Sequence, residues 1–250
     1  MVVKNEAEQL RLRLRQGAER ADRLGRAVAD RFVTGEERAW AVHEARQAGV
    51  EVAFDGGWAD AERVQVCFYP GGDEPAFTAV WLDVRWPSKF VRCDHRDLLG
   101  SLMALGMDRS FFGDLIALED HAYLLALPEI ADRLPVEWQK AGSAPLTIRA
   151  LEQPPEIEAP QGAMLRDTVP SLRLDAILAS GMKLSRARAA ELIREGAVAV
   201  DHSQEMRTDR ALSEGQLLSV RGFGRIRLRE VGDMTRKERL PILLEIFRKS

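Results

Sequence analysis

Residues 171–200 of this 250-residue chain read SLRLDAILASGMKLSRARAAELIREGAVAV. Leucine and isoleucine recur at helical spacing in the first third of this stretch, and a glycine follows them. Ser185 is a favourable N-cap for a second helix, and Gly196 is placed to end that helix in the left-handed conformation. Val198 and Val200 then alternate with small residues, as in a half-buried strand. The stretch therefore predicts two short helices, joined by a turn and followed by a strand.

Cations gather at the starts of both predicted helices. Arg173 precedes the first helix, Arg186 opens the second, and Lys183 lies in the turn between them. Arg188 is an exception, because helical spacing places it beside two glutamates in an ion-paired face. The N-terminus of a helix favours phosphate through its exposed N–H groups. We therefore expect one basic surface that contacts a nucleic-acid backbone.

The charge of the chain is unevenly distributed. Residues 165–250 contain 17 Lys and Arg against 12 Asp and Glu, although the whole chain has a net charge of −3. The front of the chain is thus acidic and the back is basic, which suggests that the back binds a polyanion. The length leaves room for one large domain or roughly two to three small ones.

The two cysteines, Cys67 and Cys93, do not form a Cys-x-x-Cys pair, and no histidine cluster accompanies them. A disulfide framework, a metal site or a cofactor is therefore not expected, and the thiols fit a cytoplasmic protein. The N-terminus is highly charged and lacks the apolar run of a signal peptide. We also expect no membrane span, because no apolar segment reaches the necessary length.

Residues 5–48 are rich in Ala, Leu, Arg and Glu, and they predict helices that glycines interrupt. The segment 31–37 is interpreted as the end of one helix, with Thr34 capping the next helix and Glu37 as the capping-box partner. A pair of glycines then separates two strand-like runs. The predicted strands are 50–54 and 63–69.

The middle of the chain alternates between strand-like and helical patterns. Asp94 is a candidate N-cap of one helix, and Pro128 opens another at a position where proline is tolerated. Glu119 and Asp120 form the turn of a predicted hairpin. The order strand, helix, strand, strand, helix, strand is the ferredoxin-like arrangement, or α-β plait. The predicted elements are strand 77–84, helix 95–105, strands 114–118 and 122–127, helix 128–140 and strand 145–151.

Aromatic residues of a ferredoxin-like sheet can stack on RNA bases. The chain lacks a ribonucleoprotein aromatic signature, so we expect most of its aromatic candidates to pack in the core. Of the adjacent Phe111 and Phe112, one is expected in the core and the other in a contact. The sheet candidates are Phe77, Trp81, Trp86 and Phe90.

The motif order of the basic stretch resembles the S-four (S4) RNA-binding domain. That family shows Arg-Leu-Asp, then Ser-Arg, then Gly-x-Val-x-Val, which correspond here to 173–175, 185–186 and 196–200. The family usually continues with Asn-Gly and later Gly-Asp, whereas this chain has Asp201-His202 and Gly215-Gln216. The first departure places an acid beside the predicted RNA surface.

Three further stretches resemble the YlmH family, which are bacterial S-four proteins associated with ribosomes. These stretches are 54–63, 95–114 and 219–239. The resemblance implies a non-enzymatic factor of ribosome-associated quality control, which clamps structured RNA on stalled large ribosomal subunits. It implies ribosomal RNA and tRNA as partners. The residues predicted to bind RNA are Arg173, Lys183, Ser185, Arg186, Arg194, Arg221, Arg225, Arg236 and Lys237.

The predicted fold class is α+β, with N-terminal helices, a ferredoxin-like middle domain and a C-terminal S-four domain. A stretch with three prolines, 152–162, marks a semi-rigid linker before the basic end. The predicted segments are 1–70 (helices and strands), 71–152 (ferredoxin-like), 153–168 (linker) and 169–250 (S-four domain with a C-terminal extension).

An RNA-modifying enzyme is the main alternative, because S-four domains also accompany pseudouridine synthases and ribosomal-RNA methyltransferases. The residues before 165 show no Gly-rich cofactor loop. His95-Arg96-Asp97 is similar to a kinase catalytic loop, but the following Asn and the Asp-Phe-Gly motif are missing. We therefore predict no catalytic residues, while an unrecognised catalytic domain and a protein–protein adaptor remain the alternatives.

Overall fold

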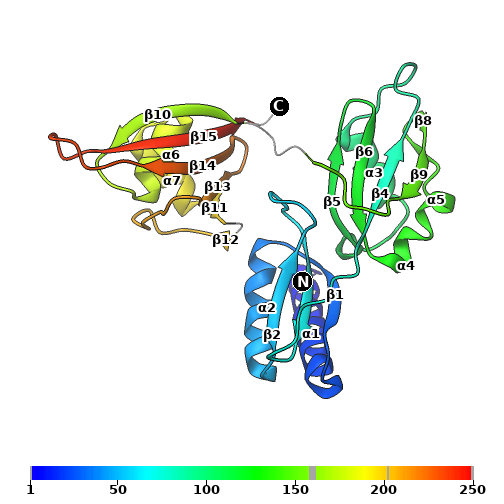
Figure 1. The fold of residues 1–250 in the computed structure, drawn as a ribbon. Helices are drawn as coiled ribbons and strands as arrows, with labels where there is room; N and C mark the ends of the chain where they lie inside the picture. The colour runs from blue at the N-terminus through cyan, green and yellow to red at the C-terminus, as the bar shows by residue number, and fades with distance from the viewer. Residues whose placement is uncertain (1, 158–161, 202, 249–250) are drawn as a thin grey trace. The chain divides into compact units, whose positions relative to one another are not determined.

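The computed structural model describes residues 2–157, 162–201 and 203–248. The chain divides into two compact units, Met1–Ile157 and Glu158–Ser250 (Figure 1). Helices and strands occur in both units, so the predicted α+β class is confirmed. No helix within the described residues is long and apolar enough to span a membrane.

The first unit begins with two helices that pack on a three-stranded antiparallel sheet in the order β1-β3-β2. Leu14 and Ala18 of the first helix and Phe68 of the sheet are fully buried in their common core. Glu37 accepts a hydrogen bond from the Thr34 N–H at 2.7 Å, so their predicted pairing at the helix start is confirmed. The elements are α1 (Val2–Leu24), β1 (Val28–Val33), α2 (Gly35–Ala48), β2 (Glu51–Asp55) and β3 (Val64–Tyr69).

The prediction of helix across 28–33 was wrong, because these residues form β1. Gly25 has a left-handed backbone (φ 59°) and follows the end of α1. Phe32 and Val33 are then buried, and β1 pairs with β3. Burial of this β-branched and aromatic run in a sheet outweighs the local helical composition.

The middle of the first unit contains a four-stranded antiparallel sheet in the order β5-β6-β4-β9. This is the ferredoxin-like strand order, so the predicted topology is confirmed. Helix α3 packs on the sheet through the fully buried Leu98 and Leu102, and Asp94 caps it by accepting from two backbone N–H groups. The elements are β4 (Val80–Arg85), α3 (His95–Met103), η1 (Arg109–Phe111), β5 (Phe112–Ala117), β6 (His121–Ala126) and β9 (Thr147–Ala150).

The predicted helix 128–140 is broken into two short helices and a small hairpin. Pro135 lies inside the predicted helix, where it lacks an N–H donor and its ring clashes with the carbonyl four residues earlier. Leu134 and Trp138 nevertheless remain buried in the core of the middle domain. The observed elements are α4 (Pro128–Ala131), α5 (Leu134–Glu137), β7 (Lys140–Ala141) and β8 (Ala144–Pro145).

Within the first unit, the elements α1 to β3 form an N-terminal module and the elements β4 to β9 form the middle domain. The two pack directly on each other. The Asp114 carboxylate of β5 accepts from the indole N–H of Trp58 at 3.0 Å and from the backbone N–H of Arg63 at 3.1 Å. Beside it, Gly113 lies so close to Phe32 that a Cβ at this glycine would be 2.8 Å from a ring carbon. These contacts fix β1 and β3 against β5.

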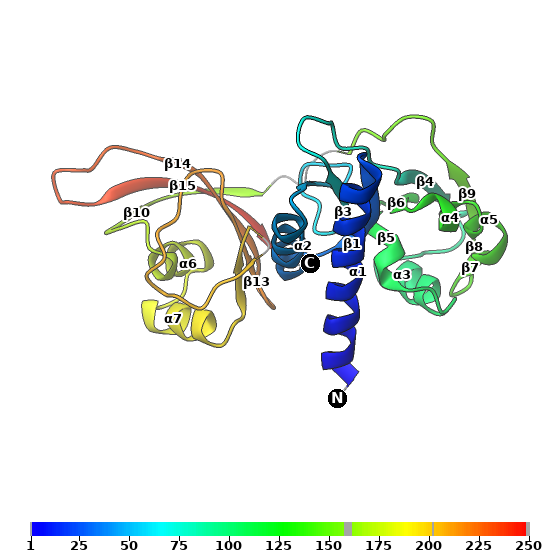
Figure 2. The ribbon, with the colours of Figure 1, turned by 90° about the horizontal axis from the view of Figure 1, so that it is seen from below.

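The second unit is a six-stranded antiparallel sheet in the order β10-β15-β14-β13-β11-β12, with two helices on one face (Figures 1 and 2). Gly181 of α6 packs so closely on Ile226 that a Cβ there would lie 2.5 Å from the isoleucine Cδ1. Residues 163–168, predicted to be linker, belong to a strand because they pair with β15. The elements are β10 (Ala163–Val169), α6 (Leu174–Met182), α7 (Arg186–Arg194), β11 (Val198–Val200), β12 (Ser203–Gln204), β13 (Leu217–Val220), β14 (Gly224–Val231) and β15 (Leu240–Arg248).

Candidate RNA-binding interface

A carboxylate at the start of α6 brings two of the predicted arginines together. Asp175 accepts from Nε and Nη2 of Arg173 at 3.2 and 3.3 Å, and from Nη2 of Arg186 at 3.1 and 3.0 Å. The aspartate side chain is only 10% exposed, whereas the two arginines are 41% and 52% exposed. The buried carboxylate therefore holds both guanidinium groups on their inner side, and their outer edges remain in solvent.

The charge state of this cluster is well defined. Burial raises the pKa of the Asp175 carboxyl, but the hydrogen bonds and charges of Arg173 and Arg186 outweigh burial and hold that pKa below its ordinary value. The carboxylate is therefore ionised at neutral pH and neutralises one of the two cations. The cluster keeps a net positive charge that faces solvent.

The turn between the helices depends on an unusual backbone at Lys183. This residue adopts the left-handed conformation (φ 54°, ψ 45°). Lys183 is also exposed to solvent. Ser185 then caps α7 by accepting a hydrogen bond from the Arg188 N–H at 3.2 Å. The predicted cap is confirmed, and the hydroxyl of Ser185 has a structural role at the helix start.

Two further predicted cations lie at the other end of α7. Arg194 is exposed in the last turn of this helix. Arg221 is also exposed. Its backbone N–H donates to the Ala197 carbonyl at 2.9 Å, which places Arg221 beside the turn that follows α7. Arg188 pairs with Glu191 on α7, as the helical spacing predicted.

Arg225 lies on the opposite face of the sheet from the helices. It alternates along β14 with the fully buried Ile226, which packs under α6. Its guanidinium carbon is 5.8 Å from the centre of the Phe247 ring on β15. The expectation of one basic surface is therefore wrong for this residue. Residues 221–223 form the turn between β13 and β14, in which Val220 pairs with Gly224.

Arg236 and Lys237 lie in the exposed loop that joins β14 to β15 (Figure 1). The loop is fastened to the end of β10, because Nε of Arg239 donates to the Thr168 hydroxyl at 2.9 Å. These two cations therefore lie in a different loop from the turn between α6 and α7, and within the described residues neither contacts Asp175.

One exposed cation near the cluster was missed by sequence reasoning. The backbone N–H of Asp175 donates to the Thr208 carbonyl at 3.1 Å, so the loop before β13 lies against the start of α6. Arg207 of this loop has a side chain that is 75% exposed. The loop has no periodic pattern, and only the fold brings it to this surface.

The two departures from the S4 pattern contact each other. Nε2 of Gln216 donates to the Asp201 carboxylate at 2.6 Å, and the Leu217 N–H donates to the same carboxylate at 2.9 Å. The Asp201 carboxylate is thus turned toward the start of β13 and holds the residues that lead into this strand. His202 lies outside the described residues.

The aromatic candidates of the middle domain divide between core and surface, and two of the four sheet candidates are buried. Trp81 and Trp86 are buried, whereas Phe90 is 87% exposed. Phe112 is fully buried, and Phe111 is half-buried under the guanidinium of Arg31, at 3.9 Å from ring centre to carbon. Phe77 is also half-buried.

The two cysteines of the first unit do not form a disulfide. Cys67 and Cys93 are free thiols. Burial raises the pKa of both, which keeps them protonated at neutral pH. Within the part of the chain that the structure describes, no group of three His, Cys, Asp or Glu side chains is arranged to hold a metal ion.

Comparison with known proteins gives two family matches and a close relative. Residues 73–154 match the family described as "Putative RNA-binding domain in YlmH", and residues 172–204 match the S4 domain. Ribosome-associated protein quality control protein P2 of Bacillus subtilis (strain 168) is 34% identical over 203 residues, which span 80% of this chain and 79% of that protein. Among solved structures, cell division protein ylmH from Streptococcus pneumoniae gives a TM-score of 0.48 at 19% identity, over 58% of this chain and 91% of that chain.

Proposed function

This chain belongs to the YlmH family, and we propose that it binds structured RNA through the arginine cluster of its S4 domain. The observation that carries the proposal is the Asp175 cluster, in which one buried carboxylate positions Arg173 and Arg186 with their outer edges in solvent. Guanidinium groups fixed in this way match the oxygens of a phosphate. Further phosphate contacts are proposed on both sides of α7. They come from Lys183 before the helix and from Arg194 and Arg221 at its end.

The proposed mechanism is electrostatic and depends on the shape of the RNA. Contacts with about five phosphates make the logarithm of the binding constant fall with the logarithm of salt concentration at a slope of about −4. Double-stranded RNA is recognised largely by shape and backbone contacts, which suits a rigid pair of short helices. Sequence readout of bases is not required.

We further propose that the RNA is ribosomal RNA or tRNA on the large ribosomal subunit, and that the protein acts there without catalysis. The support is the relative from Bacillus subtilis, whose name places it in ribosome-associated quality control. In this role the protein clamps RNA on a stalled large subunit in the cytoplasm. Turnover of ribosomal RNA to pseudouridine or methylated bases by the purified protein would replace this proposal with an RNA-modifying enzyme.

The test is the double substitution Arg173→Gln and Arg186→Gln in the full chain. Loss of two phosphate contacts is expected to weaken binding of fluorescein-labelled tRNA and of ribosomal-RNA fragments about 50-fold and to reduce the salt slope by about two. Fluorescence anisotropy across roughly 50–200 mM salt measures both the affinity and the salt slope. Co-sedimentation with large subunits, before and after nuclease, tests the ribosomal partner.

Arg188→Gln is the matched control, because it removes an exposed arginine of the same helix that is paired with Glu191. This variant is expected to bind RNA within about twofold of the wild type. Equal affinities of the double variant and the control would move the RNA site away from the helix pair.

A further inference from the structure

A second basic site lies in the first unit, far along the sequence from the S4 domain. A cavity of about 810 Å³ lies between α1, β1 and η1 and has four arginines in its wall, against the acids Glu37 and Asp108. A neighbouring cavity of about 620 Å³ shares Arg13 and Arg31 and extends along α1. We call the two cavities together the arginine cleft. Its four inner arginines are Arg13, Arg31, Arg63 and Arg109.

Two of these arginines are anchored by backbone carbonyls instead of carboxylates. Nε of Arg63 donates to the Phe112 carbonyl at 2.9 Å, and Nη1 of Arg109 donates to the same carbonyl at 2.8 Å. Burial, followed by the charge of Arg63, lowers the pKa of Arg109 to about 10. The two cations are therefore close together, and neither forms an ion pair with an acid within the described residues.

The other two inner arginines border both cavities. Arg13 lies 3.4 Å from Asp30 and donates from Nη1 to the Ser110 hydroxyl at 3.1 Å. Its Nη2 is buried and has no hydrogen-bond partner among the described residues. Arg31 lies 3.6 Å from Asp108. A buried donor without a partner is destabilising, so an acceptor from outside the chain would be favoured there.

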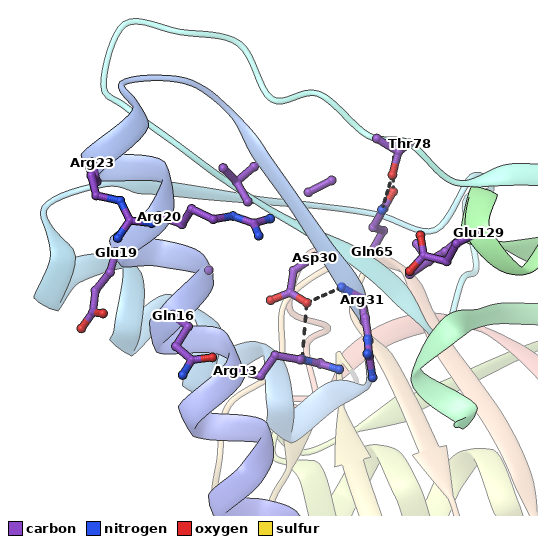
Figure 3. Close-up of a pocket in the computed structure, with 14 residues that line it drawn as sticks. Arg13, Gln16, Glu19, Arg20, Arg23, Asp30, Arg31, Gln65, Thr78 and Glu129 are labelled. Carbon is purple, nitrogen blue, oxygen red and sulfur yellow. Dashed lines mark hydrogen bonds and ion pairs between the residues drawn. The ribbon is translucent and has the colours of Figure 1, made fainter. Parts of the chain in front are cut away.

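The outer cavity extends along α1 and adds two arginines against three acids (Figure 3). The added arginines are Arg20 and Arg23, and the acids are Glu19, Asp30 and Glu129. Arg20 follows Arg13 by seven residues, which places both on one face of the helix. Figure 3 shows the Arg20 side chain extending from α1 into the cavity. Within the described residues Arg20 makes no hydrogen bond or ion pair, so its charge is available to a ligand.

We propose that the arginine cleft binds backbone phosphates of RNA, with Arg13 and Arg31 at the inner phosphate and Arg20 at the next. The inference rests on the proposed function and gives the N-terminal module a part in it, since Arg13, Arg20 and Arg31 lie outside both matched domains. RNA is favoured over an acidic peptide because the cations are spaced along α1 and the wall is completed by residue 109 of the RNA-binding domain. Guanidinium forks bind phosphate in two-point contacts.

The test compares Arg31→Gln and Arg20→Gln with Arg46→Gln in the full chain. Arg46 is an exposed arginine in the last turn of α2 and lies outside both cavity walls, so its substitution removes the same charge. Each cleft variant is expected to weaken binding of labelled tRNA and ribosomal-RNA fragments about five- to tenfold and to lower the salt slope by about one. The control is expected to stay within about twofold of the wild type. Arg31→Gln can lower the melting temperature, because Arg31 pairs with Asp108. In that case Arg20→Gln alone decides the test, since Arg20 makes no such pair within the described residues.

The outcomes separate this inference from the proposed function. If the Arg173 and Arg186 double variant loses RNA binding while both cleft variants match Arg46→Gln, the cleft inference is overturned and the proposed function stands. If the wild type binds neither RNA, the proposed function fails first.

Two other ligands are tested directly. Inorganic phosphate that raises the melting temperature of the wild type but not of Arg31→Gln, with RNA affinity unchanged in that variant, would assign the cleft to free phosphate. Labelled polyglutamate that binds through Arg31 and Arg20, again with RNA affinity unchanged, would assign it to an acidic peptide. Either result overturns the RNA inference.

Discussion

The two units of this protein hold their arginines in different ways. In the C-terminal unit, Arg173 and Arg186 are about half exposed and share the buried carboxylate of Asp175. In the first unit, Arg63 and Arg109 are half-buried and donate to a common backbone carbonyl. Burial lowers the pKa of both. The carboxylate in the C-terminal unit offsets the cost of placing two cations together. The arginines in the first unit are partly buried without such an acid, so a bound anion would stabilise them.

The comparison teaches that a basic surface cannot be inferred from the number of arginines alone. A cation beside a carboxylate is fixed in orientation but partly neutralised. A cation held by a neutral carbonyl keeps its full charge in a less polar environment, where it attracts an anion more strongly. Substitution of one carboxylate in each unit, Asp114 in the first and Asp175 in the second, tests how far each site depends on its acid.

The largest effect is expected from Asp114→Ala in the first unit. This carboxylate accepts from the Trp58 indole and from the backbone N–H groups of Glu62 and Arg63, and it fastens β3 beside the cleft. Loss of three hydrogen bonds to a charged acceptor is expected to lower the free energy of unfolding by about 3 kcal/mol. Differential scanning calorimetry measures the unfolding transitions of the wild type and the variant.

Asp120→Ala is the control, because this exposed aspartate contacts the neighbouring His121 in the β5–β6 turn. It is expected to change the free energy of unfolding by less than about 0.5 kcal/mol. A transition that is unaltered by Asp114→Ala would show that the packing of the N-terminal module does not depend on this residue.

A smaller effect is expected from Asp175→Asn in the C-terminal unit. The substitution leaves two cations without their shared anion, but both arginines reach solvent, so the expected loss is about 1–2 kcal/mol. Urea unfolding followed by circular dichroism measures it, with the exposed Asp209→Asn as control.

The pH dependence of this difference has a definite sign. Because the folded-state pKa of Asp175 is lowered, its stabilising contribution is present above the ordinary carboxyl pKa of about 4 and is lost as pH falls through the folded-state value. The free energies of unfolding of the wild type and Asp175→Asn are therefore expected to converge in acid. A gap that widens on acidification would contradict the ion-pair explanation.

The smallest effect is expected from Arg225→Gln. This residue lies on the sheet face opposite α6 and α7, so RNA affinity is expected to change by about twofold or less. Arg221→Gln removes a cation at the end of α7 and is expected to have a larger effect in the same anisotropy assay. A larger loss from Arg225→Gln would show that RNA also contacts the open face of the sheet.

Local patterns in the sequence were sufficient for much of the fold. The helix pair of the S4 domain could be predicted because its caps and turn residues lie within one short stretch. The ferredoxin-like order was predictable because each strand and helix has its own periodicity. The strand 28–33 was not, because its burial depends on β3, which lies more than thirty residues later. The break at Pro135 had a visible signal in the sequence and was overlooked.

The candidate sites were only partly predictable for a similar reason. The spacing identified Arg173 and Arg186, but it did not show that both side chains donate to the carboxylate of Asp175. The arginine cleft gave no sequence signal, because residues 13 and 109 come together only when the N-terminal module packs on the middle domain. Such nonlocal clusters require the fold.

The pairing of β10 with β15 determines where the C-terminal unit can be separated for experiments. β10 pairs with β15 from Ala163 to Val169, and the buried Glu245 of β15 accepts from the Gly162 N–H at 3.0 Å. A recombinant fragment that began at residue 169 would leave one edge of β15 open, and exposed strand edges promote aggregation. A soluble fragment for crystallisation or NMR therefore has to begin at or before Gly162.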